Sequence, residues 1–112
     1  MKGADLDALF ERWRAGDAAG AAAYFAPDAV YREARHAPVT GRAAIAAHWE
    51  SFFHSGPAWR FTERERFGDG ERVAVTYTWE IRDADGRWQA QPGCAIVRVR
   101  DGAIVEWSEY TA

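Results

Sequence analysis

Apolar residues recur at helical spacing in the first half of the chain and predict three helices. In residues 5–15 they fall three or four positions apart, with Asp5 as a candidate N-cap. Asp17 can cap a second, alanine-rich helix, which ends before Pro27 because the residue preceding a proline is disfavoured in helical geometry. A third helix is predicted over residues 41–56. Its apolar stripe consists of Ile45, Trp49, Phe52 and Phe53.

From Trp59 onward the apolar period shortens to two residues, which indicates half-buried strands. The turn sequences "GDG", "ADGR" and "DGA" separate four such segments and predict a four-strand antiparallel meander. A bulge or bend is expected at "QPG", because Pro92 cannot donate to a ladder. An earlier short strand is expected over residues 30–33, followed by a loop at "HAPVTG".

Helices followed by a run of strands indicate the α+β fold class. The sheet is too short to close on itself, so we expect a cone-shaped curved sheet that wraps around the N-terminal helices and has an open mouth. With 112 residues, the chain is expected to form one domain, 1–112, around one core. An aromatic share of 14% favours a well-ordered globule over a disordered chain.

Charge and cysteine content argue against several function classes. Acidic residues outnumber basic ones by 17 to 14 and no block of Lys and Arg is present, so nucleic acid is not expected as a partner. The N-terminus lacks the apolar run of a signal peptide, and no segment has the roughly 20 apolar residues that span a bilayer. We therefore expect a cytoplasmic protein with no membrane partner. Cys94 is alone and is expected to be an inert buried thiol.

The order of motifs over the whole chain resembles the nuclear transport factor 2-like superfamily, with its cystatin-like α+β architecture. The segments that carry the resemblance are the two N-terminal helices around "GD", then "FAPDAVY", "GRAAIAAHW" and the final "DGAIVEWSEY". Within the superfamily, the pattern is similar to SnoaL-like polyketide cyclases and ketosteroid isomerase relatives. The resemblance implies a curved antiparallel sheet, a deep conical pocket and a homodimer. Members include isomerases, cyclases, dehydratases, epoxide hydrolases and non-enzymatic binding domains, so fold alone implies no function.

The resemblance also implies candidate catalytic residues. "APDAVYRE" places Glu33 where the isomerase has its carboxylate base. "IVEWSEY" places Glu109 where the polyketide cyclase has its acid/base aspartate. His48 corresponds to an aromatic residue that faces the isomerase pocket.

The oxyanion hole of the isomerase has no counterpart at the matching positions. Its first-helix tyrosine corresponds to Leu9 or Phe10, and its later-strand aspartate corresponds to Cys94 or Ala95. None of these residues offers a strong hydroxyl donor, and each lost donor costs on the order of 10² to 10³ in rate. Steroid isomerase activity is therefore not expected.

The residues themselves leave alternatives open at each candidate position. If Tyr31 points inward, Glu33 does too, because side chains two apart share a face; otherwise Glu33 forms a solvated ion pair with a neighbouring arginine. For Glu109 parity does not decide, and the alternative is an exposed position near the C-terminus. His48 is either a pocket residue or a core or solvent-facing histidine. The three lie on different elements without metal-ligand spacing, so neither a metal nor a cofactor is expected.

We therefore expect a cofactor-free homodimer whose conical hydrophobic pocket binds a small apolar or aromatic carbonyl compound. Any chemistry is expected to be the proton transfer of an isomerase, cyclase or dehydratase, with Glu33 as base and Glu109 or His48 returning or positioning the proton. The alternative is a non-catalytic ligand-binding or dimerisation domain. The tryptophans are most simply core and interface residues, and some line the cone. The residues expected to bind the ligand are Trp13, Tyr31, Trp49, Phe53, Trp79 and Trp107.

Overall fold

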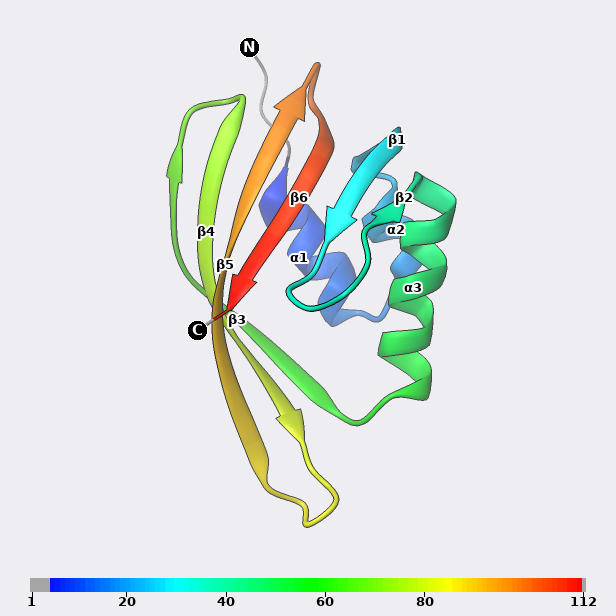
Figure 1. Ribbon diagram of the computed structural model, residues 1–112, viewed down its shortest axis with the longest axis vertical. Helices are drawn as coiled ribbons and strands as arrows, with labels where there is room; N and C mark the ends of the chain where they lie inside the picture. The colour runs from blue at the N-terminus through cyan, green and yellow to red at the C-terminus, as the bar shows by residue number, and fades with distance from the viewer. Residues whose placement is uncertain (1–4, 112) are drawn as a thin grey trace.

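The computed structural model describes residues 5–111, in which three helices pack against one curved sheet (Figure 1). The helices are α1 (Leu6–Arg14), α2 (Ala18–Ala22) and α3 (Arg42–Ser55). The strands are β1 (Phe25–Arg32), β2 (Val39–Thr40), β3 (Trp59–Gly68), β4 (Arg72–Arg82), β5 (Trp88–Arg100) and β6 (Ala103–Thr111). The expected α+β class is confirmed. Residues 1–4 and 112 lie outside the described residues, and they include part of the expected domain and of the N-terminal segment considered above.

The predicted caps determine where the first two helices begin. The Asp5 carboxylate accepts the backbone N–H of Ala8 at 3.0 Å, and the Asp17 carboxylate accepts that of Gly20 at 2.9 Å. Each carboxylate thereby satisfies a donor that the helix leaves unpaired. α1 buries its apolar stripe against the sheet, and burying each large side chain contributes about 1.5–3 kcal/mol. Within residues 5–111, no helix has the length and apolar composition needed to cross a membrane.

The sheet has the order β2-β1-β6-β5-β4-β3, and β3 to β6 form the predicted antiparallel meander. The register between β4 and β5 is unbroken along the whole of β4, so no bulge interrupts it at "QPG". Pro92 pairs in register with Thr78, next to the point where β6 ends opposite Gly93. Figure 1 shows β5 curving along its length instead, with the β4–β5 hairpin extending past the helices.

β1 differs from the short strand predicted for this segment. It begins at Phe25, before Pro27, and β2 occupies part of the expected loop. β1 also pairs parallel with β6, whereas only antiparallel pairing was predicted. Its last residue, Arg32, lies opposite Ser108, while β6 continues to Thr111. The end of β6 therefore has no β1 partner, and a hollow lies here between the end of β6 and the loop after β1.

The core lies between the helices and the concave face of the sheet, and aromatic rings dominate it. The contacts are mostly tilted or edge-to-face, the arrangements that aromatic pairs prefer. Trp13 of α1 is at the centre of this cluster and is 1% exposed. The rings in contact with Trp13 are those of Phe10, Trp49, Phe61, Trp79 and Trp107.

Candidate functional site

A cavity of about 410 Å³ opens between α3, the inner face of the sheet and the loop after β1. This volume is in the usual range of small-molecule sites. Aromatic rings form much of the wall, and carboxylate and imidazole groups lie among them. The aromatic residues that line the cavity are Trp13, Tyr31, Trp49, Phe52, Phe53 and Trp79. The polar residues are Glu33, Arg35, His36, His48, Gln91, Glu109 and Thr111.

Eight of the nine candidate site residues from the sequence line this cavity, including Glu33, His48 and Glu109. The exception is Trp107, which is 0% exposed and lies behind the wall. The packing of the core covers the Trp107 ring, so this residue does not line the cavity as expected. Trp107 instead contacts Glu109 through its indole nitrogen, so it supports the cavity wall rather than forming it.

A β-bulge explains why Glu109 faces inward. Val105 has no partner in the register between β5 and β6, so β6 changes the parity of its inner face at this residue. Ile104 and Trp107 are consequently both fully buried although they are three positions apart. Glu109 follows Trp107 by two positions and shares its face. Parity along the uninterrupted sequence was undecided for this reason.

Two donors hold one carboxylate oxygen of Glu109. The indole Nε1–H of Trp107 donates to Oε2 at 3.0 Å, and the Tyr31 hydroxyl donates to the same oxygen at 3.2 Å. Burial raises the pKa of Glu109 to about 7; the hydrogen bond from Trp107 opposes this rise, and the charge of Glu33 adds to it. Near neutral pH, both protonation states of Glu109 are therefore populated, as a general acid or base requires.

Two tyrosine hydroxyls stay protonated near Glu109. Burial, followed by the charge of Glu109, raises the pKa of both Tyr31 and Tyr77. The Tyr77 hydroxyl is buried without a hydrogen-bond partner among residues 5–111. It is nevertheless close enough to Glu109 for the carboxylate charge to raise its pKa. Gly93 lies opposite on β5, where a Cβ would be 3.0 Å from the Tyr77 ring. Sequence reasoning missed Tyr77 as a site residue, although its place on the inner face of β4 was a usable signal.

Glu33 lies in the turn after β1 and pairs with His48 of α3. The hydrogen bond joins His48 Nε2 to Glu33 Oε1, which requires the imidazole proton on Nε2, and the two side chains are 35% and 28% exposed. The alternative ion pair between Glu33 and the preceding arginine does not form, because Arg32 pairs with Glu106 on β6. Gly41 positions α3: its N–H donates to the Ala29 carbonyl at 2.8 Å.

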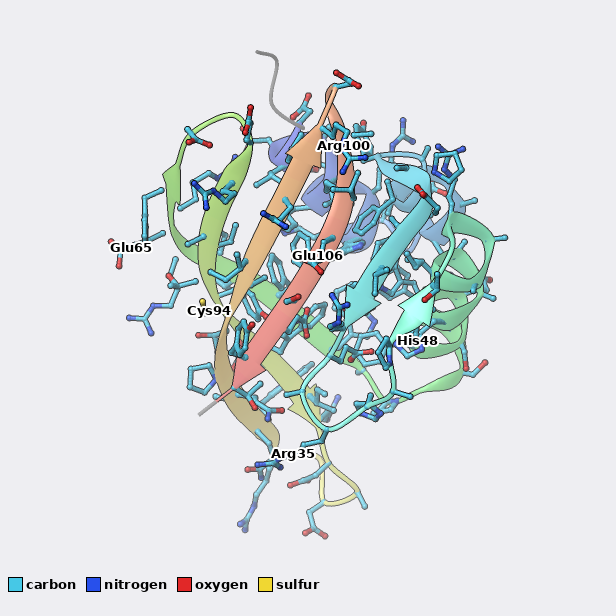
Figure 2. The ribbon with its side chains drawn as sticks, turned by 45° about the horizontal axis from the view of Figure 1, so that its top comes forward. Arg35, His48, Glu65, Cys94, Arg100 and Glu106 are labelled. Carbon is cyan, nitrogen blue, oxygen red and sulfur yellow. The ribbon has the colours of Figure 1, made fainter. Side chains whose placement is uncertain are left out.

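The positions that match the isomerase's oxyanion hole are apolar or face away from the cavity. Leu9, Phe10 and Ala95 are buried, and Cys94 is half-buried on the opposite face of β5 rather than buried as expected (Figure 2). Hydroxyl groups approach Glu109 from Tyr31 and Tyr77 instead. Within the described part of the chain, no group of three or more His, Cys, Asp or Glu side chains is arranged to hold a metal ion.

Comparisons with known proteins agree with this architecture. The model of the SnoaL-like domain family matches residues 6–107. A putative polyketide cyclase from Xanthomonas campestris pv. campestris has a TM-score of 0.77 and 25% identity, with 94% of this chain and 85% of that chain covered. TerC, co-crystallized with polyporic acid, has a TM-score of 0.82 and 19% identity, with 96% and 88% covered.

A third solved structure, an LEH-like epoxide hydrolase from M. tuberculosis, has a TM-score of 0.80 and 18% identity, with 96% of this chain and 79% of that chain covered. No curated protein sequence gives a significant match. The structural neighbours also include proteins described as NTF2-like. The chain therefore belongs to the SnoaL-like domain family and has the nuclear transport factor 2-like fold.

Proposed function

We propose that this protein binds a small apolar or aromatic carbonyl compound in the cavity and catalyses proton transfer on it without a cofactor. The observation that best supports the proposal is that Glu33, His48 and Glu109 reach one aromatic-lined cavity from three separate elements. Titratable groups in a cavity, one of them with a pKa strongly shifted by burial, are typical of catalytic sites. A small-molecule-binding domain is also supported by the neighbours named as a polyketide cyclase, an epoxide hydrolase and a complex with polyporic acid.

Glu33 is the proposed base. Its Oε1 is hydrogen-bonded to His48, which leaves Oε2 free to accept a proton from the carbon next to the substrate carbonyl. The electron pair of the broken C–H bond moves into the carbonyl and generates an enolate. Glu33 then returns the proton to the same carbon, or to another carbon of a conjugated substrate, which completes an isomerisation. His48 is the positioning residue for the carboxylate.

The protonated form of Glu109 is the proposed hydrogen-bond donor to the enolate oxygen. With a pKa of about 7, a large fraction of this carboxyl carries a proton at neutral pH. Trp107 and Tyr31 hold Oε2, so the proton is placed on Oε1. Such a donor acts in a partly desolvated, aromatic-lined site, where electrostatic stabilisation is stronger than in bulk water. It supplies the stabilisation that the apolar residues at the isomerase-like positions lack.

The aromatic wall orients the ligand between the two acids. Trp13 and Trp49 present edge-to-face indole rings whose centroids are 5.3 Å apart, a surface that suits a flat apolar molecule. Both indole N–H groups lack a hydrogen-bond partner among the described residues. Both nitrogen atoms are fully buried, so the two rings contact a ligand through their carbon atoms, and each unpaired donor carries the cost of a buried polar group.

The proposal can be tested by following exchange of the methyl protons of 2-acetonaphthone with solvent deuterium by NMR. The variant E33Q should exchange at least about 100-fold more slowly than the parent protein, because it lacks the base. E65Q makes the same chemical change at an exposed carboxylate on β3, away from the cavity, and should leave the rate unchanged (Figure 2). A parent protein that binds the ketone without accelerating exchange would leave only the non-catalytic binding domain.

We propose the outer face of the sheet as the interface of a homodimer. Ile96 on β5 is 38% exposed and Tyr110 on β6 is 60% exposed, and the register between these strands places them as near neighbours. Exposed apolar side chains that gather on one face are typical of interaction surfaces. The variant I96E should convert a dimer to a monomer in size-exclusion chromatography with light scattering. A monomeric parent protein would contradict this part of the proposal.

A further inference from the structure

We propose that the natural ligand carries a carboxylate, which Arg35 binds at the mouth of the cavity. The inference rests on the proposed function and adds the substrate class. The apolar body of the ligand occupies the aromatic cavity, and its charged end lies at the opening.

Arg35 lies where two hollows meet. It lines the main cavity and also a more open hollow of about 400 Å³ outside it. The two hollows share Glu33 and Glu109, so they adjoin at the place where β1 ends and β6 continues without a partner strand. Figure 2 marks Arg35 beside the loop that leaves the end of β1. A charged group held at this position keeps contact with solvent, while the rest of the molecule enters the cavity.

The guanidinium of Arg35 has no ion pair or side-chain hydrogen bond with residues 5–111. The carboxylates around it are already engaged: Glu33 with His48, and Glu109 with Tyr31 and Trp107. Arg32, a nearby arginine in the sequence, differs from Arg35 in having an ion-pair partner, Glu106. Arg35 is therefore available to an external anion, and its planar fork of donors matches the two oxygens of a carboxylate.

The backbone at Arg35 is in a conformation that an arginine rarely adopts. Its φ is 70°, in a turn that the His36 N–H closes onto the Glu33 carbonyl. Glycine or asparagine usually occupies such a position, because a Cβ is crowded in the left-handed region. The other non-glycine residue with positive φ in the described chain is Asp101, and aspartate tolerates this region better. Backbone strain of this kind is often found at binding sites, so it supports a binding role for the Arg35 side chain.

The test compares two probes that share one ring system and differ in charge, 2-naphthoate and 2-acetonaphthone, by isothermal titration calorimetry. The parent protein should bind the carboxylate about tenfold more tightly, as expected for a charge-assisted hydrogen bond. R35Q should lose this preference and bind the neutral ketone within about twofold of the parent affinity. R100Q removes the same charge at an exposed arginine outside both hollows and should change neither affinity (Figure 2).

R35G separates binding from folding. Glycine relieves the strained φ, so the thermal midpoint should equal or exceed that of the parent protein while the preference for 2-naphthoate is lost. Equal binding of both probes by the parent, or equal losses for both probes in R35Q, overturns the carboxylate inference. The ketone exchange assay would then still report on the proposed function. Binding of neither probe overturns the inference together with the proposed function of the cavity.

Discussion

The two carboxylates that face the cavity have contrasting surroundings. Glu109 lies inside β6, where Trp107 and Tyr31 hold one of its oxygens and burial raises its pKa to about 7. Glu33 lies just beyond the end of β1, in a turn, and its 28% exposed side chain pairs with His48. One cavity thus contains a half-buried acid held by two donors and a second carboxylate with a histidine partner. Groups whose surroundings differ in this way can divide the roles of acid and base.

The contrast follows from the position of each residue along its strand. Glu109 lies within the ladder between β6 and β5, opposite Ala95, and this pairing fixes the direction of its side chain. At the end of a strand, the chain leaves the ladder and solvent reaches the side chain. A glutamate can therefore serve as a neutral hydrogen-bond donor at position 109 and as a base at position 33, although the two side chains are chemically identical.

Removal of the Glu109 carboxyl is expected to have the largest effect. E109A removes the proposed donor and leaves the Trp107 and Tyr31 donors without their acceptor, so the exchange rate should fall by about 10² to 10³. E109Q keeps an acceptor oxygen for both and adds an N–H donor, so it should lose no more than about tenfold. Initial rates of 2-acetonaphthone exchange measure both variants. Equal rates in E109A and E109Q would contradict a donor role.

The next effect concerns the free energy of unfolding as a function of pH. The pKa of Glu109 rises from 4.5 to about 7 on folding, so the folded state is favoured while this carboxyl is protonated. The contribution of Glu109 to the free energy of unfolding is complete below pH 4.5 and is lost as the pH rises to about 7. The linkage between protonation and folding sets this contribution at about 3 kcal/mol. The lowered pKa values of Asp69 and Asp83 act below pH 3.8 and do not interfere in this window.

Urea unfolding at several pH values between 4.5 and 8 tests this linkage. E109Q cannot titrate at this position, so its stability should fall less over this range, and it should be the more stable protein at pH 8. If the parent and E109Q lost stability in parallel, the raised pKa of Glu109 would be wrong.

Much of the fold and of the cavity wall could be predicted from spacing. Trp13 and Trp49 lie on apolar helical stripes, and Trp79 lies on the alternating face of β4, so regular periodicity was enough to place each ring. Parity with Tyr31 placed Glu33 correctly, even though Glu33 lies beyond the last residue of β1. Local pattern is informative here because each of these elements remains regular.

The features that were missed depend on contacts between distant segments. The bulge at Val105 is visible only in the pairing of β6 with β5. In the sequence alone, simple alternation gives β6 both apolar and polar residues on each of its faces. The parallel pairing of β1 with β6 depends on how the chain between them folds back. The alternation of apolar and polar residues along a strand gives no information about its partner strand. The conformation of Arg35 could not be predicted either, because a residue with left-handed backbone geometry in a turn is usually glycine.

A smaller effect is expected from His48, which positions Glu33 and does not contact the proposed reacting atoms. H48A should lower kcat by about tenfold with little change in KM, since the base remains but is no longer fixed in direction. H48Q can place an amide N–H near the Nε2 position and should recover part of the loss. A large rise in KM in H48A would instead indicate that His48 binds the ligand directly.

The smallest effect is expected from Y31F, which removes one of the two hydrogen bonds to Glu109. This bond lowers the pKa of the carboxyl, so its loss should raise that pKa by a fraction of a unit to about one unit. Because the proposed mechanism needs protonated Glu109, activity falls as the pH rises through its pKa, and the midpoint of that fall should move to higher pH in Y31F. Y24F makes the same change on a tyrosine that lines neither hollow and lies outside the proposed dimer face, and it should leave the midpoint in place. A midpoint that moves to lower pH in Y31F would show that the group titrating in the profile is not Glu109.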